Sequence, residues 1–119
     1  MTAAEFRRLA LSLPDAVEAA HMGHPDFRVA GKIFATLGYP SDGYGVVMLS
    51  PQDQDLMVRD YPKNFAPVRG SWGASGSTTV LLRGASKRAV ATALESAWRK
   101  RAPKQKEKAA PRSKRSAAG

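Results

Sequence analysis

Two histidines are the residues best suited to metal or proton chemistry in this sequence. His21 and His24 are separated by Met-Gly and precede Pro25. A zinc site normally needs four ligands, and only Glu18 and Asp26 lie near the two histidines in the sequence. The chain has no cysteine, which excludes disulfides, thiolate ligands and a cysteine nucleophile. We therefore predict no metal site, and a hydrogen-bonding or structural role for one imidazole.

A glycine-rich segment, residues 70–76, is a second place to look for chemistry. Its spacing matches neither G-x-G-x-x-G nor G-x-x-x-x-G-K-[ST], and a strand is expected after it where those phosphate loops need a helix. Ser75 does not lie in a G-x-S-x-G nucleophile elbow. Two interpretations stay open. The glycines have a conformational role, or their backbone N–H groups hold one phosphate of a polymer.

Catalytic groupings are missing from the rest of the sequence. The carboxylates are scattered, mostly at expected helix starts and turns, and no spacing joins a serine, a histidine and an aspartate. We therefore predict that the protein is not an enzyme, uses no cofactor and has no small-molecule substrate.

Positive charge beside aromatic residues offers the clearest binding chemistry. Nineteen Lys and Arg against ten Asp and Glu give a net charge of +9, and residues 102–119 carry six basic residues against Glu107 alone. Such a charge attracts polyanions, because Lys and Arg neutralise phosphates and exposed aromatic rings stack on bases. The predicted nucleic-acid-binding residues are Arg28, Lys32, Arg69, Trp72, Arg83, Lys87 and Arg88, followed by Lys104, Lys106, Lys108, Arg112, Lys114 and Arg115.

Helices are expected at both ends of the part of the chain that folds. A capping box formed by Thr2 and Glu5 begins a first helix that Pro14 stops. A short helix is expected over residues 51–58, and a long last helix follows Ser86. The apolar stripes are Phe6, Leu9, Ala10 and Leu13 in the first helix and Val90, Ala93, Leu94, Ala97 and Trp98 in the last.

Four short strands are expected between these helices. Residues 27–30 and 32–37 are predicted to form a hairpin, and residues 44–49 and 78–83 two further strands. Residues 15–24 are expected to form a turn of helix and a loop, and residues 59–77 an irregular segment. Alternation places Phe27 and Val29 on one face and Arg28 on the other, and sets Ile33, Ala35 and Leu37 opposite Lys32, Phe34 and Thr36.

The order of these elements predicts an α+β fold, α-β-β-β-β-α. Short, closely linked strands favour a four-stranded antiparallel sheet, with the two long helices on one face. The other face would be open, and Arg28, Lys32, Arg69, Trp72 and Arg83 would border one basic surface there, with Trp72 partly exposed. As solvated charges, Arg28 and Lys32 are expected to matter little for stability.

The length of 119 residues is that of one domain. We expect a domain over residues 1–103 and a disordered basic tail over residues 104–119, which has few apolar groups. No apolar run is long enough to span a membrane, and no secretory signal is evident. A cytoplasmic location and no membrane partner are therefore expected.

Several segments together resemble one known family. They are Leu11-Ser-Leu-Pro14, the run from His21 to Ala35 with Phe-Arg-Val-Ala-Gly-Lys-Ile-Phe as its most specific part, Trp72-Gly73 with Gly76 before a strand, and Ala97-Trp98. From about Phe6 to Pro103 the chain is similar to the MmcQ/YjbR family, bacterial proteins described as DNA-binding with a CyaY-like fold, as in bacterial frataxin. The resemblance implies two helices on an antiparallel sheet and a DNA partner.

The likeness of that fold to frataxin implies iron chemistry only where an acidic ridge is present. The first helix offers Glu5 alone beside Arg7 and Arg8. Iron delivery is therefore not expected.

We predict a non-enzymatic DNA-binding protein that contacts mainly the phosphate backbone. The alternative is a protein-interaction adaptor whose open sheet face docks a partner and whose tail serves solubility. A salt titration of binding to duplex DNA separates the two, because phosphate contacts release counterions.

Overall fold

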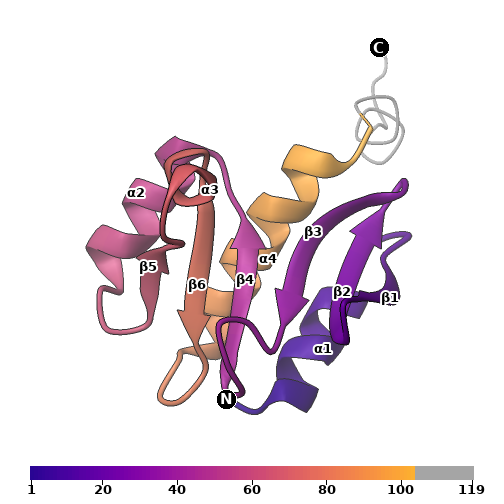
Figure 1. Ribbon diagram of the computed structural model, residues 1–119, viewed down its shortest axis with the longest axis horizontal. Coiled ribbons are helices and arrows are strands. Elements are labelled where there is room, and N and C mark those ends of the chain that lie inside the picture. Colours follow the sequence, from indigo (N-terminus) through magenta and orange to yellow (C-terminus); the bar gives the residue numbers. More distant parts are fainter. Residues whose placement is uncertain (104–119) are drawn as a thin grey trace.

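Six antiparallel strands form one sheet in the computed structural model, which describes residues 1–103 (Figure 1). In chain order they are β1 (Val17–His21), β2 (His24–Val29), β3 (Lys32–Leu37), β4 (Tyr44–Met48), β5 (Phe65–Pro67) and β6 (Ser77–Leu81). Their order across the sheet is β1-β2-β3-β4-β6-β5, and every pairing is antiparallel.

The helices are α1 (Ala3–Leu11), α2 (Pro51–Asp60), α3 (Ser71–Ala74) and α4 (Lys87–Arg101). The cap that the sequence predicts at Thr2 is confirmed, and Ser50 and Ser86 cap α2 and α4 in the same way, because each hydroxyl accepts a backbone N–H three residues further on. The sequence predicts that Pro14 stops the first helix. The helix ends before that residue, at Leu11, with Ser12 as its C-cap.

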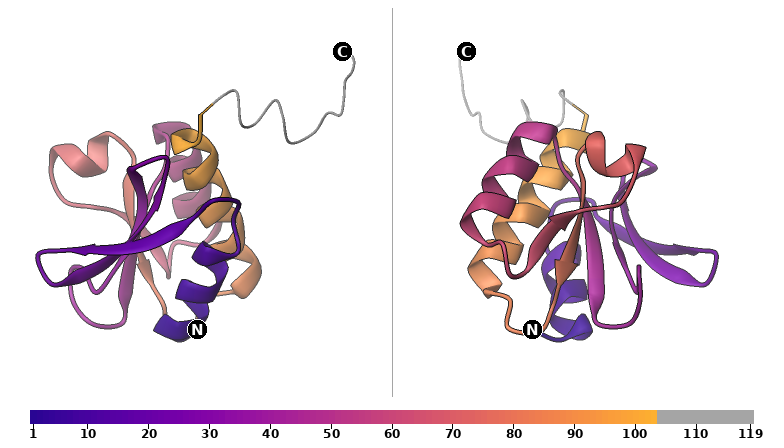
Figure 2. Two further views of the ribbon diagram at one scale, coloured as in Figure 1. Left: turned by 90° about the vertical axis from the view of Figure 1, so that its right-hand side faces the viewer. Right: turned by 60° about the vertical axis from the view of Figure 1, so that its left-hand side comes forward.

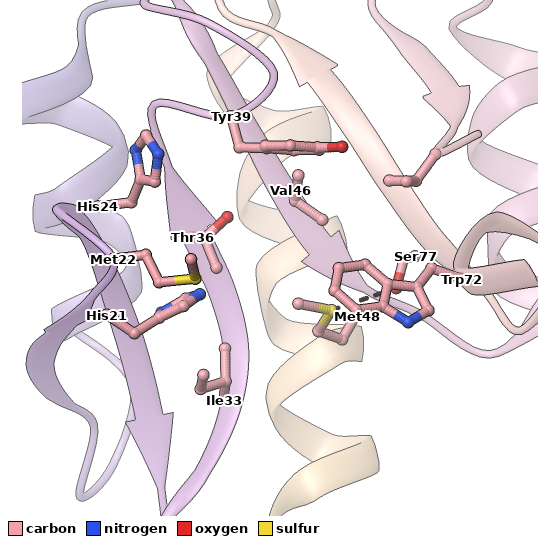
Figure 3. A pocket seen from close by; sticks show the side chains of 11 residues that line it. His21, Met22, His24, Ile33, Thr36, Tyr39, Val46, Met48, Trp72 and Ser77 are labelled. Carbon is pink, nitrogen blue, oxygen red and sulfur yellow. Dashed lines mark hydrogen bonds between the residues drawn. The ribbon is translucent and has the colours of Figure 1, made fainter. Parts of the chain in front are cut away.

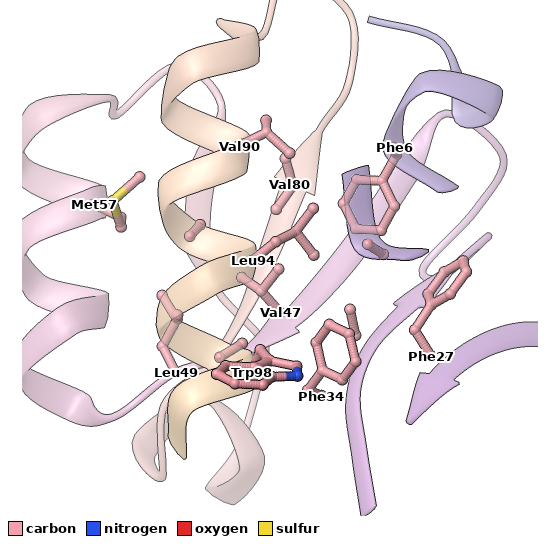
Figure 4. Close-up of a cluster of buried hydrophobic side chains, with 14 of the residues drawn as sticks. Phe6, Phe27, Phe34, Val47, Leu49, Met57, Val80, Val90, Leu94 and Trp98 are labelled. Atoms are coloured by element: carbon pink, nitrogen blue, oxygen red, sulfur yellow. The ribbon is translucent and has the colours of Figure 1, made fainter. Parts of the chain in front are cut away.

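Helix α4 lies at the centre of the hydrophobic core. It packs against β3 and β4, and α1 and α2 each pack against it. Its predicted apolar stripe is buried, and Figure 4 shows Leu94 and Trp98 among Phe6, Phe34 and other core side chains. The Trp98 indole N–H donates to the carbonyl of Pro14 at 2.9 Å, which ties the end of α4 to the segment after α1.

The helices α1, α2 and α4 lie on the same side of the sheet (Figure 2). This arrangement confirms the prediction that the first and last helices share a face. Of the helices within residues 1–103, the short α3 alone lies on the opposite face, at one end of the sheet. The opposite face is therefore the one on which a partner can reach the sheet.

The prediction of four strands is wrong, because two further strands form the edges of the sheet. Strand β1 lies where the sequence predicts a turn of helix, and β5 and α3 lie inside the segment predicted to be irregular. Strands β1 and β2 are joined at Met22-Gly23, with φ of 51° and 81°. Two positive φ values are typical of a type I′ turn, and Ala30-Gly31, with 52° and 79°, has the same geometry.

A β-bulge changes which side chains β3 presents to each face. Phe27 pairs with Ala35 but Arg28 pairs with Ile33, so Phe34 is the extra residue. Phe34 is fully buried in the core, whereas Ile33 faces the open side. The alternation predicted for these two residues is therefore wrong, since a bulge reverses the alternation beyond it.

Candidate binding groove on the open face of the sheet

A groove of about 440 Å³ lies on the open face of the sheet (Figure 3). Its floor comes from β3, β4 and β6, one wall from the hairpin of β1 and β2, and the other wall from α3. The residues that line it are His21, Met22, His24, Ile33, Thr36, Tyr39, Val46, Met48, Val68, Trp72 and Ser77. We call it the open-face groove.

Large apolar side chains dominate the open-face groove. Met22 and Trp72 lie on its two walls and are 91% and 69% exposed. Between them Ile33, Val46 and Met48 form an apolar floor. Two exposed apolar walls around an apolar floor make the groove a candidate interaction site.

Two glycines allow the backbone to hold Trp72 in its position. A Cβ on Gly73 would lie 1.6 Å from the carbonyl oxygen of Val68, so no larger residue fits there. Gly76 has a φ of 117°, and a Cβ on it would lie 1.9 Å from the carbonyl oxygen of Leu49. These close approaches support the conformational interpretation of the glycine-rich segment.

A buried glutamine fastens α3 to the rest of the fold. The side-chain amide nitrogen of Gln54 lies 2.9 Å from the Gly73 carbonyl oxygen, 3.1 Å from that of Ser77 and 3.2 Å from the hydroxyl of Thr78. Helix α2, on the far side of the sheet, therefore holds the backbone that presents Trp72 to the groove.

A second hollow, of about 410 Å³, adjoins the open-face groove and shares Tyr39 and Val68 with it. It is lined in addition by Pro40, Pro67, Arg69 and Thr79. Arg69 is exposed and stands three residues before Trp72. The two hollows together therefore combine an apolar surface with a cation at its edge.

A fully buried carboxylate lies under the hairpin wall. Asp26 has no solvent exposure, and its two oxygens accept from Nε and Nη2 of Arg28 at 2.7 and 3.0 Å. Its Oδ2 is also 2.7 Å from Nδ1 of His21. The hydrogen bonds from Arg28, helped by the one with His21, outweigh burial and hold the pKa of Asp26 below its usual range.

This carboxylate determines what His21 offers to the groove. A carboxylate accepts hydrogen bonds, so it selects the tautomer of a neutral His21 that carries its proton on Nδ1. Nε2 is then the acceptor nitrogen on a ring that extends into the groove (Figure 3). The predicted hydrogen-bonding role for one histidine is confirmed for His21.

Of the predicted binding residues within residues 1–103, Arg28, Arg69 and Trp72 share the open face. Trp72 is exposed, as predicted. Arg28 faces the open side, also as predicted, but the expectation that it is a freely solvated charge is wrong. Because its guanidinium neutralises the buried Asp26, removing Arg28 would take two hydrogen bonds and the compensating charge from that carboxylate and cost stability.

Lys32 and Arg83 do not join this surface, so the prediction that they border it is wrong. Lys32 pairs with Val29, a core residue, so its side chain leaves the sheet on the helix side. Arg83 follows the end of β6 opposite to Ser77 and Trp72, and Lys87 and Arg88 are exposed in the first turn of α4.

Lys104, Lys106, Lys108, Arg112, Lys114 and Arg115 lie outside the described residues, as does the predicted disordered tail. Within residues 1–103, no group of three His, Asp or Glu side chains is placed to hold a metal ion. The helices of the same part of the chain are also too short or too polar to span a membrane.

Sequence reasoning missed several residues of the groove. Met22 and Ile33 lie in it because of a hairpin turn and a bulge. Tyr39 lines it from the turn after β3, and Met48 lines it from β4. The Met-Gly pair between the two histidines is a signal that could have located the hairpin, since a glycine in the second position of a two-residue turn is typical of type I′.

Comparisons with known proteins agree with this architecture. A family model described as YjbR matches residues 11–100. No curated protein matches the sequence. The crystal structure of the Deinococcus radiodurans protein DR2400, described by the domain DUF419, resembles this chain with a TM-score of 0.67 at 17% identity, over 82% of this chain and 75% of that one. At such an identity the likeness shows a shared fold, with helices and an antiparallel sheet.

Proposed function

The chain belongs to the YjbR family, and from that premise we propose that it is a non-enzymatic DNA-binding protein whose site is the open face of its sheet. The observation that carries the proposal is the exposed pair of Arg69 and Trp72 beside the open-face groove. A guanidinium binds phosphate, and an exposed indole stacks on bases.

The charge around the groove supports a polyanionic ligand. Among the described residues that line the two hollows there is an arginine but no aspartate or glutamate. Asp26, which lies beneath the hairpin wall, is neutralised by Arg28. With a net charge of +9 for the whole chain, a phosphate backbone meets attraction and little local repulsion.

The test is a titration of labelled DNA with the full chain at several salt concentrations, followed by fluorescence anisotropy. We expect affinity to fall with salt, by a log–log slope of roughly −0.9 per phosphate contact on duplex. Arg69→Ala should lower the magnitude of that slope by roughly one.

Arg88→Ala is the matched control, because it removes the same charge from an exposed position on α4, away from the open face. If Arg69→Ala and Arg88→Ala weaken binding equally, the charge acts without a site. If the wild-type chain does not bind DNA at low salt, the proposed function is wrong.

A second candidate is a protein-interaction adaptor that docks a partner on the same face. The apolar floor and walls of the open-face groove favour it, because exposed apolar side chains in a groove also suit an apolar peptide. This candidate predicts that capture of the partner depends weakly on salt, whereas DNA binding depends on it strongly.

A further inference from the structure

We propose that the open-face groove binds unpaired nucleobases, so that the protein prefers single-stranded DNA to duplex. This inference rests on the proposed function and specifies the ligand of that site. It follows from a mismatch between the groove and the outer surface of a double helix.

A duplex presents sugars and phosphates on its outside and stacks the faces of its bases against one another. The side chains on the floor of the groove, Ile33, Val46 and Met48, have nothing to offer a phosphate. They match the flat, apolar face of a base that has left the stack. Only a single strand can place the face of a base in the groove while its phosphates stay at the edge of the groove.

The walls are suited to hold a flat ring. Trp72 presents an exposed indole from a helix that Gln54 and the close packing of Gly73 hold in place, so stacking on it costs little reordering. The thioether of Met22 extends from the opposite wall (Figure 3). Sulfur packs favourably against aromatic rings.

Polar groups inside the groove can meet the edge of a base. The Nε2 atom of His21 and the hydroxyl of Thr36 lie among the apolar groups. Because Asp26 engages Nδ1, Nε2 of the neutral ring accepts from an exocyclic amino group or a ring N–H. The bases all carry such a donor, so this hydrogen bond favours unpaired bases in general. Arg69 in the adjoining hollow is placed for the phosphate of a neighbouring nucleotide.

The experiment compares three ligands of equal length on the full chain at one salt concentration. They are a labelled thymidine oligonucleotide, the same strand in a duplex, and an abasic oligonucleotide with the same phosphates. We expect the single strand to bind more tightly than the other two. Trp72→Ala should weaken single-strand binding by about 5- to 150-fold, the loss typical of a stacked base.

The matched control is Leu56→Ala, which truncates an exposed apolar side chain on α2, away from the groove. It should change none of the three affinities. Met22→Asn is a second groove variant for the case that Trp72→Ala does not fold, because asparagine accepts the positive φ of position 22. It should also weaken the single strand selectively.

Equal affinities for the three ligands would overturn the inference and leave the proposed function standing, as phosphate binding alone. The same holds if neither groove variant reduces single-strand binding. If none of the three ligands binds, the proposed function and the inference both fail, and the adaptor candidate is favoured.

Discussion

Asp26 lies fully buried beside a surface for which we propose a polyanionic ligand. Its carboxylate is compatible with that ligand because Arg28 and His21 engage both of its oxygens. The pair of Asp26 and Arg28 also joins neighbouring side chains on the same face of β2. Asp26 is therefore expected to stabilise the hairpin wall rather than to contact DNA.

Replacing Asp26 by Asn should lower the free energy of unfolding by about 1.5–3 kcal/mol, the usual range for hydrogen bonds to a charged group. An amide has one acceptor oxygen, and its NH₂ group would face a guanidinium or imidazole donor. The folded protein holds the pKa of Asp26 below its ordinary value, so its contribution is present above about pH 3.9 and is lost as the pH falls through the lower folded-state pKa.

Urea titrations from neutral pH to below about pH 4, the ordinary range of an aspartate pKa, would measure this effect. The wild type should lose stability toward acid more steeply than Asp26→Asn does. Asp55→Asn, an exposed carboxylate on α2, serves as the control and should follow the wild type. Parallel acid profiles for all three proteins would contradict the role given to Asp26.

A second prediction at the scale of one residue concerns the stability of a Gly73 variant. Gly73→Ala should destabilise the protein by at least the roughly 1–3 kcal/mol that overpacking costs in a core, because the new Cβ meets the carbonyl of Val68. Gly43→Ala is the control. Gly43 has a φ of 87° and open space around it, so it should cost only about 1–2 kcal/mol of left-handed strain. Thermal melts that rank Gly43→Ala as the more harmful change would contradict this.

At the scale of elements, the sequence predicts those helices and strands that have a regular apolar pattern or a capping residue. The capped helices, the buried stripe of α4 and the four central strands follow from these patterns. Strand β1 does not, because Val-Glu-Ala-Ala-His has a low β propensity and becomes a strand only by pairing with β2. The candidate binding face could be predicted only in part. Trp72 and Arg69 stand out by type, but Met22 and Ile33 reach the open-face groove through a turn and a bulge.

The two hairpin turns of matching geometry allow a prediction about these elements. Met22→Asn and Ala30→Asn should each raise the melting temperature slightly, because asparagine tolerates positive φ better than methionine or alanine. Only Met22 lines the groove, so only Met22→Asn should weaken ligand binding. Calorimetry and anisotropy on the same two variants separate the turn from the site. A loss of binding in Ala30→Asn would contradict this assignment.

At the scale of the whole molecule, positive charge is divided between the described domain and the sequence beyond it. Residues 104–119 contain six of the nineteen basic residues. Within the domain, cations at the end of α4 have structural roles. Lys100 donates to the carbonyl of Leu49 at 2.9 Å, where burial lowers its pKa, and Arg101 donates to that of Ile33 at 3.1 Å. The net charge therefore overstates the number of Lys and Arg residues that are available to bind phosphate.

Ending the chain after Pro103 should leave the melting temperature unchanged, because Ala102, at the end of α4, is retained in the core. The same truncation should reduce the magnitude of the salt slope of DNA binding, by roughly 0.9 for each phosphate that the protein no longer neutralises. A clearly lower melting temperature would show that the removed residues pack on the domain. An unchanged slope would show that they do not bind DNA.

The insertion of β6 between β4 and β5 has a consequence for how the chain folds. Strands β1 to β4 join through turns, but Met48 of β4 and Ser77 of β6 are 29 positions apart. Closing that longer loop costs chain entropy that is recovered only once β6 has docked. Strand β6 brings Val80 to the core and Ser77 to the groove in the same step. A nascent chain that has not docked β6 therefore lacks part of the proposed binding surface, and we expect ligand capture to require a docked β6.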